Sequence, residues 1–370
     1  MKLWSISFAY RLGLGFHALN NEGADGSNLM QPRRIDVGQV TYDGISGEII
    51  RRHILENFVD VCRSQAIPML PLSEGLHADR GIYAIRKKAK ELGCQKLTKG
   101  NPDKLYEAVR NAISGCSVID IGGYLAPFSG KDEGVEEAGE GAGSEGKETD
   151  KTKKVAPEAV IMGDLSEIGG KKEGAPYTVK RDSVFDVAWL ISEQPQDLTI
   201  TQHSAYRPSG QQGLFSQTMR SNTYGGVIRA DLHRIGTDDY WYLQKGKDRL
   251  AIDAEEQRKR QIALIESIIN FIASPTGAKT AGWAPHVFLT EGAILLTSVR
   301  TAPFASPIKV DLTNKDTPVQ ADTSYAKTME DLKNDTDTWA WKFKDAKELL
   351  AVVSEIKDKL GVNKDAEKKD

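Results

Sequence analysis

Cysteine is scarce in this sequence, with three residues among 370. They lie far apart and have none of the short spacings of metal-binding pairs: Cys62, Cys94 and Cys116. The six histidines form no His-x-x-x-His pair, so metal ligation is not expected. We therefore expect reduced, structural cysteines in a cytoplasmic protein that binds no metal and no other cofactor.

Long hydrophobic runs are also missing. One of the longest, Gly292 to Val299, is too short to cross a bilayer and predicts a strand. The N-terminus lacks the three features of a signal peptide, which are a basic start, an apolar stretch and a small-residue cleavage site. No secretion signal and no membrane partner are therefore expected. Gly13-Leu14-Gly15 and Gly122-Gly123 lack the strand–helix context of a nucleotide-binding fingerprint. The aromatic strand motif of ordinary RNA-recognition domains is missing as well.

Positive charge is modest, because the net charge is -3. The distribution is uneven: residues 131–150 hold eight acidic residues and two lysines, a charge of -6, so the rest of the chain carries +3. Residues 129–157 are rich in Gly, Glu and Lys and have almost nothing apolar to bury. We expect them to form a disordered acidic loop, because burial cannot offset its ordering entropy.

The first sixty residues predict a strand followed by a helix. Apolar and polar residues alternate from Leu3 to Leu12, which is typical of a strand with one buried face. A helix is predicted to begin after Ser46, an N-cap residue type, because Ile50, Ile54 and Phe58 repeat at helical spacing, with Val61 completing the apolar stripe.

The remaining elements complete an α+β pattern. Strands are expected near residues 117–125, 177–191, 217–235 and 287–299, and helices near 84–92, 103–113, 253–272 and 345–360. The order β, α, β, β, α, β predicts a ferredoxin-like, RRM-like palm with an inserted helical lobe and a protruding β-hairpin. The expected units are residues 1–62 (first palm strand and helix), 63–115 (lobe), 116–128 (palm strand), 129–157 (acidic loop), 158–194 (palm and thumb strand), 195–218 (hairpin), 219–306 (palm strand, helix and strand) and 307–370 (C-terminal extension).

Basic residues gather near the predicted strand-to-helix junction: Arg33, Arg34, Arg51, Arg52 and His53. Ser46 and Gly47 would offer backbone N–H groups at the start of the helix, where a phosphate binds well. The region is therefore a candidate site for a polyanion. The alternative for Arg51 and Arg52 is a solvated helix face.

Three segments carry a family resemblance. The first is Ile45-Ser46-Gly47-Glu48-Ile49-Ile50-Arg51-Arg52, preceded by Asn20-Asn21-Glu22-Gly23 and Pro32-Arg33-Arg34; the others are Gly115 to Leu125 and Met219 to Ile228. Their order and spacing resemble the DevR family of CRISPR-associated proteins, most closely the type I-A form. The resemblance implies a non-catalytic backbone subunit of a Cascade complex in antiviral defence, with a palm, helical fingers and a β-hairpin thumb.

The resemblance also implies partners and RNA contacts. The partners would be crRNA, the target DNA strand, head-to-tail copies of the chain, and the handle-capping, large, small and helicase-nuclease subunits. The RNA-binding residues expected on this basis are Asn20, Asn21, Gln31, Arg33, Arg34, Ser46, Gly47, Arg51, Arg52, His53, Arg220, Ser221 and Lys279. For Lys279 the alternative is a cation at a helix C-terminus.

In the family, the thumb displaces guide bases at intervals, which requires an apolar wedge. The candidates near the tip of the expected hairpin are Tyr206, Leu214, Phe215 and Met219, and their alternative role is packing at the hairpin base. Two other functions stay open. One is a guide-directed, metal-dependent endoribonuclease using Asp25, a residue that a turn would also favour. The other is a free-standing RNA-binding regulator.

Overall fold

The structure is a computed structural model that describes residues 3–19, 21–24, 29–94, 102–128, 177–205, 213–275, 285–333 and 337–360. Several predictions lie outside these ranges: the acidic loop 129–157 and residues Asn20, Asp25, Tyr206 and Lys279. The predicted class, a mixture of helices with a large antiparallel sheet, is confirmed.

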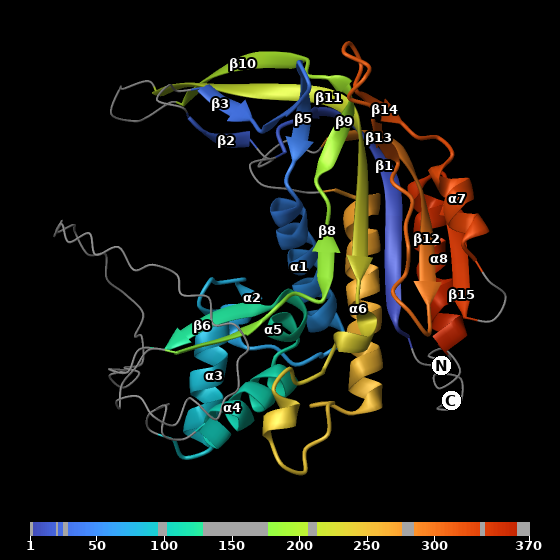
Figure 1. Ribbon diagram of the computed structural model, residues 1–370. Helices are drawn as coiled ribbons and strands as arrows, with labels where there is room; N and C mark the ends of the chain where they lie inside the picture. Colours follow the sequence, from blue (N-terminus) through green and yellow to red (C-terminus); the bar gives the residue numbers. More distant parts are fainter. Residues whose placement is uncertain are drawn as a thin grey trace.

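Eleven strands of the described chain form one large sheet (Figure 1). Its main path runs β15 (Thr338–Phe343), β12 (His286–Thr297), β1 (Ser5–His17), β11 (Gly213–Ala230), β9 (Leu190–Pro195), β5 (Val40–Ile45) and β4 (Arg34–Val37). Beside this path, β8 (Phe185–Val187), β10 (Leu198–Ala205) and β3 (Leu29–Pro32) pair with β11, and β2 (Asn21–Ala24) pairs with β3. The pairing of β3 with β11 is parallel and the others are antiparallel.

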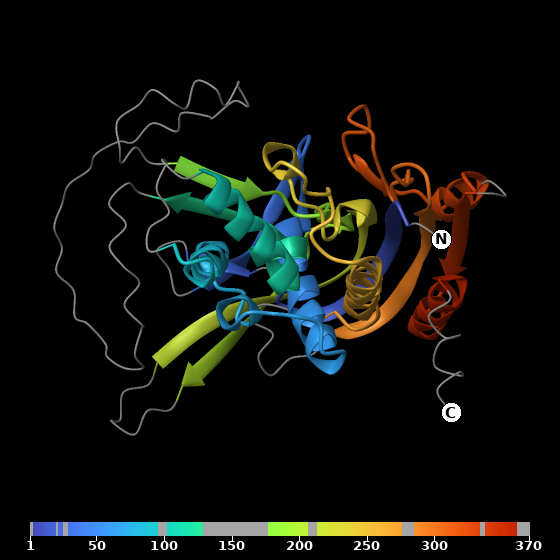
Figure 2. The ribbon, with the colours of Figure 1, turned by 90° about the horizontal axis from the view of Figure 1, so that it is seen from below.

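Two long helices pack side by side against one face of this sheet (Figures 1 and 2). The first, α1 (Gly47–Ser64), follows the predicted stripe, with Ile50, Ile54 and Phe58 fully buried. The second, α6 (Ala254–Ala273), begins after the N-cap Asp253, whose carboxylate accepts the Glu256 N–H. α8 (Ala346–Leu360) packs beside α6. The core therefore lies between the helices and the sheet.

Burial of β1 on both faces corrects the prediction of one buried face. Its even-numbered side chains, such as Phe8 and Leu12, join the helix-side core, whereas Ala9 packs in a second cluster with Tyr325 and Met329. Those two residues come from α7 (Tyr325–Asp331), within a C-terminal region that also forms β13 (Ile308–Val310) and β14 (Val319–Ala321). The alternating small and polar residues of β1 thus lie beneath distant segments and not in water.

The helical lobe contains α2 (Pro71–Glu74), α3 (Arg80–Glu91), α4 (Pro102–Gly115) and α5 (Ser117–Gly122). The predicted strand at 117–125 is wrong, because residues 117–122 form α5 and bury Val118, Ile119 and Ile121 together. The strand that follows, β6 (Tyr124–Phe128), pairs with β7 (Tyr177–Arg181) in a separate two-stranded sheet. Residues 116–128 therefore contribute no strand to the large sheet.

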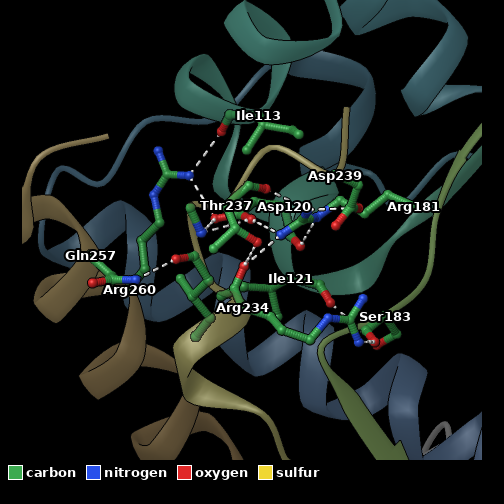
Figure 3. A network of polar contacts seen from close by, with 12 residues as sticks. Ile113, Asp120, Ile121, Arg181, Ser183, Arg234, Thr237, Asp239, Gln257 and Arg260 are labelled. Carbon is green, nitrogen blue, oxygen red and sulfur yellow. Dashed lines mark hydrogen bonds and ion pairs between the residues drawn. The ribbon is translucent and has the colours of Figure 1, made fainter. Parts of the chain in front are cut away.

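One buried carboxylate joins the lobe to the rest of the molecule (Figure 3). Asp120 on α5 accepts from Arg181 Nη2 at 2.6 Å, from Arg260 Nη1 at 2.9 Å and from the Gly236 N–H at 2.9 Å. The two guanidinium groups also donate to carbonyl oxygens of five residues: Ile113, Ser114, Asp120, Arg234 and Thr237. All three charged side chains are fully buried. Arg181 also pairs with Asp239 at 3.0 Å and Arg260 with Glu256 at 2.8 Å, so Asp120 is the one fully buried carboxylate that the two arginines share.

We expect Asp120→Ala to lower the free energy of unfolding by about 3–5 kcal/mol, because two buried guanidinium groups would lose the buried carboxylate that they share and keep only the partly exposed Asp239 and Glu256. Urea unfolding followed by circular dichroism measures this cost. Asp182→Ala is the matched control, since Asp182 is exposed and pairs loosely with Lys180 at 3.8 Å. Equal, small effects of the two substitutions would contradict the role given to Asp120.

Candidate nucleic-acid interface

The start of α1 is packed against the sheet. The Ser46 hydroxyl accepts the Ile49 N–H at 3.4 Å, as an N-cap does. A Cβ on Gly47 would lie 2.2 Å from the Val187 carbonyl oxygen, so only glycine allows this close approach. Both residues are buried. They hold the helix in place, and the Ser46 hydroxyl occupies the Ile49 N–H at the start of the helix. Direct contact of Ser46 or Gly47 with RNA stays a prediction.

Three arginines meet beside the first turns of α1. Arg51 and Arg52 lie on this helix, and Arg80 begins α3 in the lobe. Burial lowers the pKa of Arg80, and the positive charges of Arg51 and Arg52 lower it further. A Cβ on Gly122 would lie 3.0 Å from Leu55 of α1 and 3.7 Å from Arg80 Nη2, so the Arg80 guanidinium lies near α1, one turn after Arg51.

The negative charge beside these arginines is smaller than the positive charge. Arg52 pairs with Glu56 at 3.0 Å, and Glu48 lies in the same turn as Arg51. Among the described residues, no side chain forms an ion pair or hydrogen bond with Arg51. Arg80 donates only to the carbonyl oxygens of His77 and Gly123, while its buried Nε has no partner in the part of the chain that the structure describes. The cluster can therefore accept an anion such as a phosphate.

Arg33 lies at the same end of α1. Its guanidinium carbon is 5.1 Å from the centre of the Trp189 ring, a cation–π contact, and Trp189 is 39 % exposed. The residue before Trp189, Ala188, lies next to Gly47. Arg34 is exposed on β4. The structure thus brings the predicted arginines Arg33, Arg51 and Arg52 to the start of one helix, as the sequence suggested, and adds Arg80 and Trp189.

Other predicted contacts have different surroundings. His53 is buried, and its Nδ1 lies 2.6 Å from the Glu56 carboxylate. The Ser221 hydroxyl is exposed and accepts the Phe16 N–H. The backbones of Asn21 and Gln31 lie in β2 and β3. RNA contact by these four residues stays a prediction.

Arg220, another predicted RNA contact, is buried in the structure, and its contact with RNA stays a prediction. Its side chain is almost entirely inaccessible, lies 3.9 Å from Asp43 and donates to the Leu19 carbonyl oxygen. Next to it, His17 Nε2 and the Tyr224 hydroxyl are 2.9 Å apart. The arginine therefore stabilises the junction of β1, β5 and β11 from inside the molecule.

The predicted hairpin residues form paired strands. β10 and β11 run antiparallel from Leu198 opposite Arg220 to Ala205 opposite Gly213. These strands, with β2 and β3, form an arm that extends from the sheet toward the same side as the helical lobe (Figure 1). Of the wedge candidates, Leu214 and Phe215 lie on β11 near the end of this pairing, and Met219 is half-buried. Their wedge role stays a prediction.

The described residues contain no group of three His, Cys, Asp or Glu side chains that could hold a metal ion. In the same residues, no helix has the length and apolar character needed to cross a membrane.

Stability should depend on pH through His17. Burial and the positive charge of Arg220 hold the pKa of His17 well below its usual value, so the folded protein keeps the imidazole neutral. The unfolded chain binds a proton near pH 6.5. We expect the free energy of unfolding to be highest above this pH and to fall below it, by at most about 1.4 kcal/mol per pH unit from this group.

Urea unfolding between about pH 7 and pH 5 tests this expectation. His17→Gln should flatten the pH dependence, because glutamine does not titrate. His77→Gln changes an exposed histidine and serves as the control. An unchanged slope in the His17 variant would show that another group dominates.

A comparison with models of protein families agrees with the family suggested by the sequence motifs. Residues 8–317 match the family described as "CRISPR-associated negative auto-regulator DevR/Csa2". No curated protein matches the chain. One similar solved structure is a chain of a "CRISPR RNA-guided surveillance complex, pre-nicking", with 13 % sequence identity and a TM-score of 0.42; the match covers 90 % of each chain. Another is a chain of a "CRISPR RNA-guided surveillance complex", with 10 % identity and a TM-score of 0.41; the match covers 95 % of this chain and 98 % of that chain. Because the family match spans most of the sequence, the chain belongs to the DevR/Csa2 family of CRISPR-associated proteins.

Proposed function

We propose that this chain is a non-catalytic backbone subunit of a CRISPR effector complex that binds guide RNA and presents its bases to a target DNA strand. The observation that carries the proposal is the cluster of Arg51, Arg52 and Arg80, whose positive charge exceeds the nearby negative charge. A phosphate backbone would supply the missing negative charge. The family membership favours guide RNA as its source.

The proposed palm is ferredoxin-like. Its strands would be β12, β1, β11 and β8 in that spatial order, with α1 and α6 on one face. In chain order these elements read β1, α1, β8, β11, α6, β12, which is the split βαβ pattern. This palm would support the basic cluster at the start of α1, the arm with β10 as a thumb, and the lobe as fingers.

In the proposed assembly, several copies bind head to tail along one guide. The handle-capping, large, small and helicase-nuclease subunits of a Cascade complex would be the other partners. Phosphate contacts at the arginine cluster would hold any guide sequence, because every nucleotide carries the same charge. Base pairing between guide and target would then supply the sequence specificity.

Replacing the cluster arginines should weaken RNA binding about equally for unrelated guides. For Arg51→Ala with Arg52→Ala, we expect the slope of log K against log salt to fall by roughly 0.7 per lost single-strand contact. Adding Arg80→Ala should lower it further. Fluorescence anisotropy with a labelled guide at several salt concentrations measures the slope.

Arg63→Ala is the matched control, because Arg63 lies at the other end of α1 and pairs with Asp60 and Glu74. It should leave the slope unchanged. A slope that stays the same in the double and triple variants would rule out the cluster as the RNA site.

Assembly and catalysis separate the proposal from its alternatives. On guide-length RNA, we expect a sizing column to show particles that contain several protein copies. A complementary RNA added with Mg²⁺ should stay intact. Particles with one copy would favour a free-standing regulator, and cleavage that Asp25→Ala abolishes would favour an endoribonuclease.

A further inference from the structure

We propose that Phe16 and Phe288 form a stacking site for nucleobases of single-stranded RNA at the end of β1 and β12. The inference rests on the proposed RNA-binding function and adds a base-contacting site to the phosphate site. The two side chains are 59 % and 61 % exposed, although both belong to central strands of the sheet.

Irregular strand pairing directs both phenylalanines outward. Between β1 and β12, Gly13 faces Leu289 and Leu14 faces Val287, so Phe288 is an extra residue with no opposite partner. Between β1 and β11, Leu14 faces Asn222 and His17 faces Arg220, so Gly15 and Phe16 lie opposite Ser221 alone. Such β-bulges redirect side chains and are common beside functional sites.

Phe16 also has a backbone conformation that non-glycine residues rarely adopt. Its φ is 51°, in the left-handed region. The hydrogen bond from its N–H to the Ser221 hydroxyl, at 2.9 Å, holds this conformation. Positions with such strain cluster at ligand-binding sites. Here the effect is that a large apolar ring stays in solvent.

The Phe288 ring lies over a glycine. A Cβ on Gly13 would come within 2.4 Å of Phe288 Cε2, so the missing side chain leaves room for the ring at this position. The Phe16 ring lies edge-on to His286, with ring centres 6.0 Å apart. The result is an exposed group of aromatic rings. Stacking on such rings suits any base, because every base has a π face.

The rings lie next to a residue that the proposed function already assigns to RNA. Ser221, which positions Phe16, is one of the proposed RNA contacts. Arg11 of β1 binds two carboxylates, Glu193 of β9 and Glu291 of β12, at 2.5 and 2.6 Å. This pairing reduces the repulsion that they would exert on phosphates. Neither Glu193 nor Glu291 would therefore be an unpaired carboxylate near a strand whose bases stack on the rings.

Abasic RNA tests the inference. The probe is a labelled oligouridylate of about ten nucleotides, compared with the same backbone lacking bases. We expect Phe288→Ala and Phe16→Ala each to weaken oligouridylate binding roughly fivefold or more, and to leave binding of the abasic strand unchanged. Phe288→Trp should preserve or strengthen oligouridylate binding. An oligomer that contains 5-iodouridine should cross-link to Phe16 or Phe288 under ultraviolet light.

Control variants separate base stacking at this site from a general loss of affinity or of folding. Phe304 lies outside the proposed site and is 47 % exposed, so Phe304→Ala should change the affinity neither for oligouridylate nor for the abasic strand. Because the side chains are exposed, the melting temperatures of the variants should equal that of the wild type. The inference is overturned if the Phe16 and Phe288 variants bind both strands as the wild type does, or if they lose only self-association measured without RNA.

The same assay distinguishes failure of the proposed function. If wild-type protein binds oligouridylate and the arginine variants weaken it while the phenylalanine variants do not, the proposed function stands and the stacking site is wrong. If wild-type protein binds neither strand, both proposals fail.

Discussion

The buried carboxylate of Asp120 fixes the position of the helical lobe relative to the sheet. An isolated carboxylate in this place would carry a large desolvation cost, which the two arginines and the Gly236 N–H offset only in one geometry. Arg181 and Arg260 come from β7 and α6, so the geometry joins three elements that are far apart in sequence. Arg80 belongs to the lobe and bonds to Gly123, just after α5. Its place beside Arg51 therefore depends on Asp120.

The arginine cluster is accordingly a product of tertiary structure. Arg51 and Arg52 are placed by α1, which is held by the Ser46 cap and by the close contact of Gly47 with Val187. Arg80 is the first residue of α3 and therefore belongs to the helical lobe. Burial lowers the pKa of Arg80, and the positive charges of Arg51 and Arg52 lower it further, so the protonated form is kept there at a cost. The fold tolerates this cost at a site where an anion would relieve it.

Sequence patterns predicted the elements whose signals are local. The stripe and cap of α1 and the acidic start of α6 needed only spacing and capping rules. The patterns failed where distant segments decide the outcome. Residues 117–122 are apolar enough for a buried strand or helix, and the buried face of β1 under α7 depends on residues some three hundred positions away. Arg220 was expected to contact RNA because of the family resemblance, and its burial beside Asp43 has no local sign in the sequence. Trp189 and Arg80 join the candidate interface only through folding.

The pairing of β1 affects how the chain can fold during synthesis. β1 leaves the ribosome first, but its partners β11 and β12 begin about two hundred residues later or more. At about 5–20 residues per second, a ribosome needs roughly 10–40 s to reach β11. During that interval the apolar strand lacks its native neighbours at both edges and on the face that α7 covers. Such a strand is prone to pair with other chains. Production of this protein therefore favours conditions in which nascent chains are dilute or bound by chaperones.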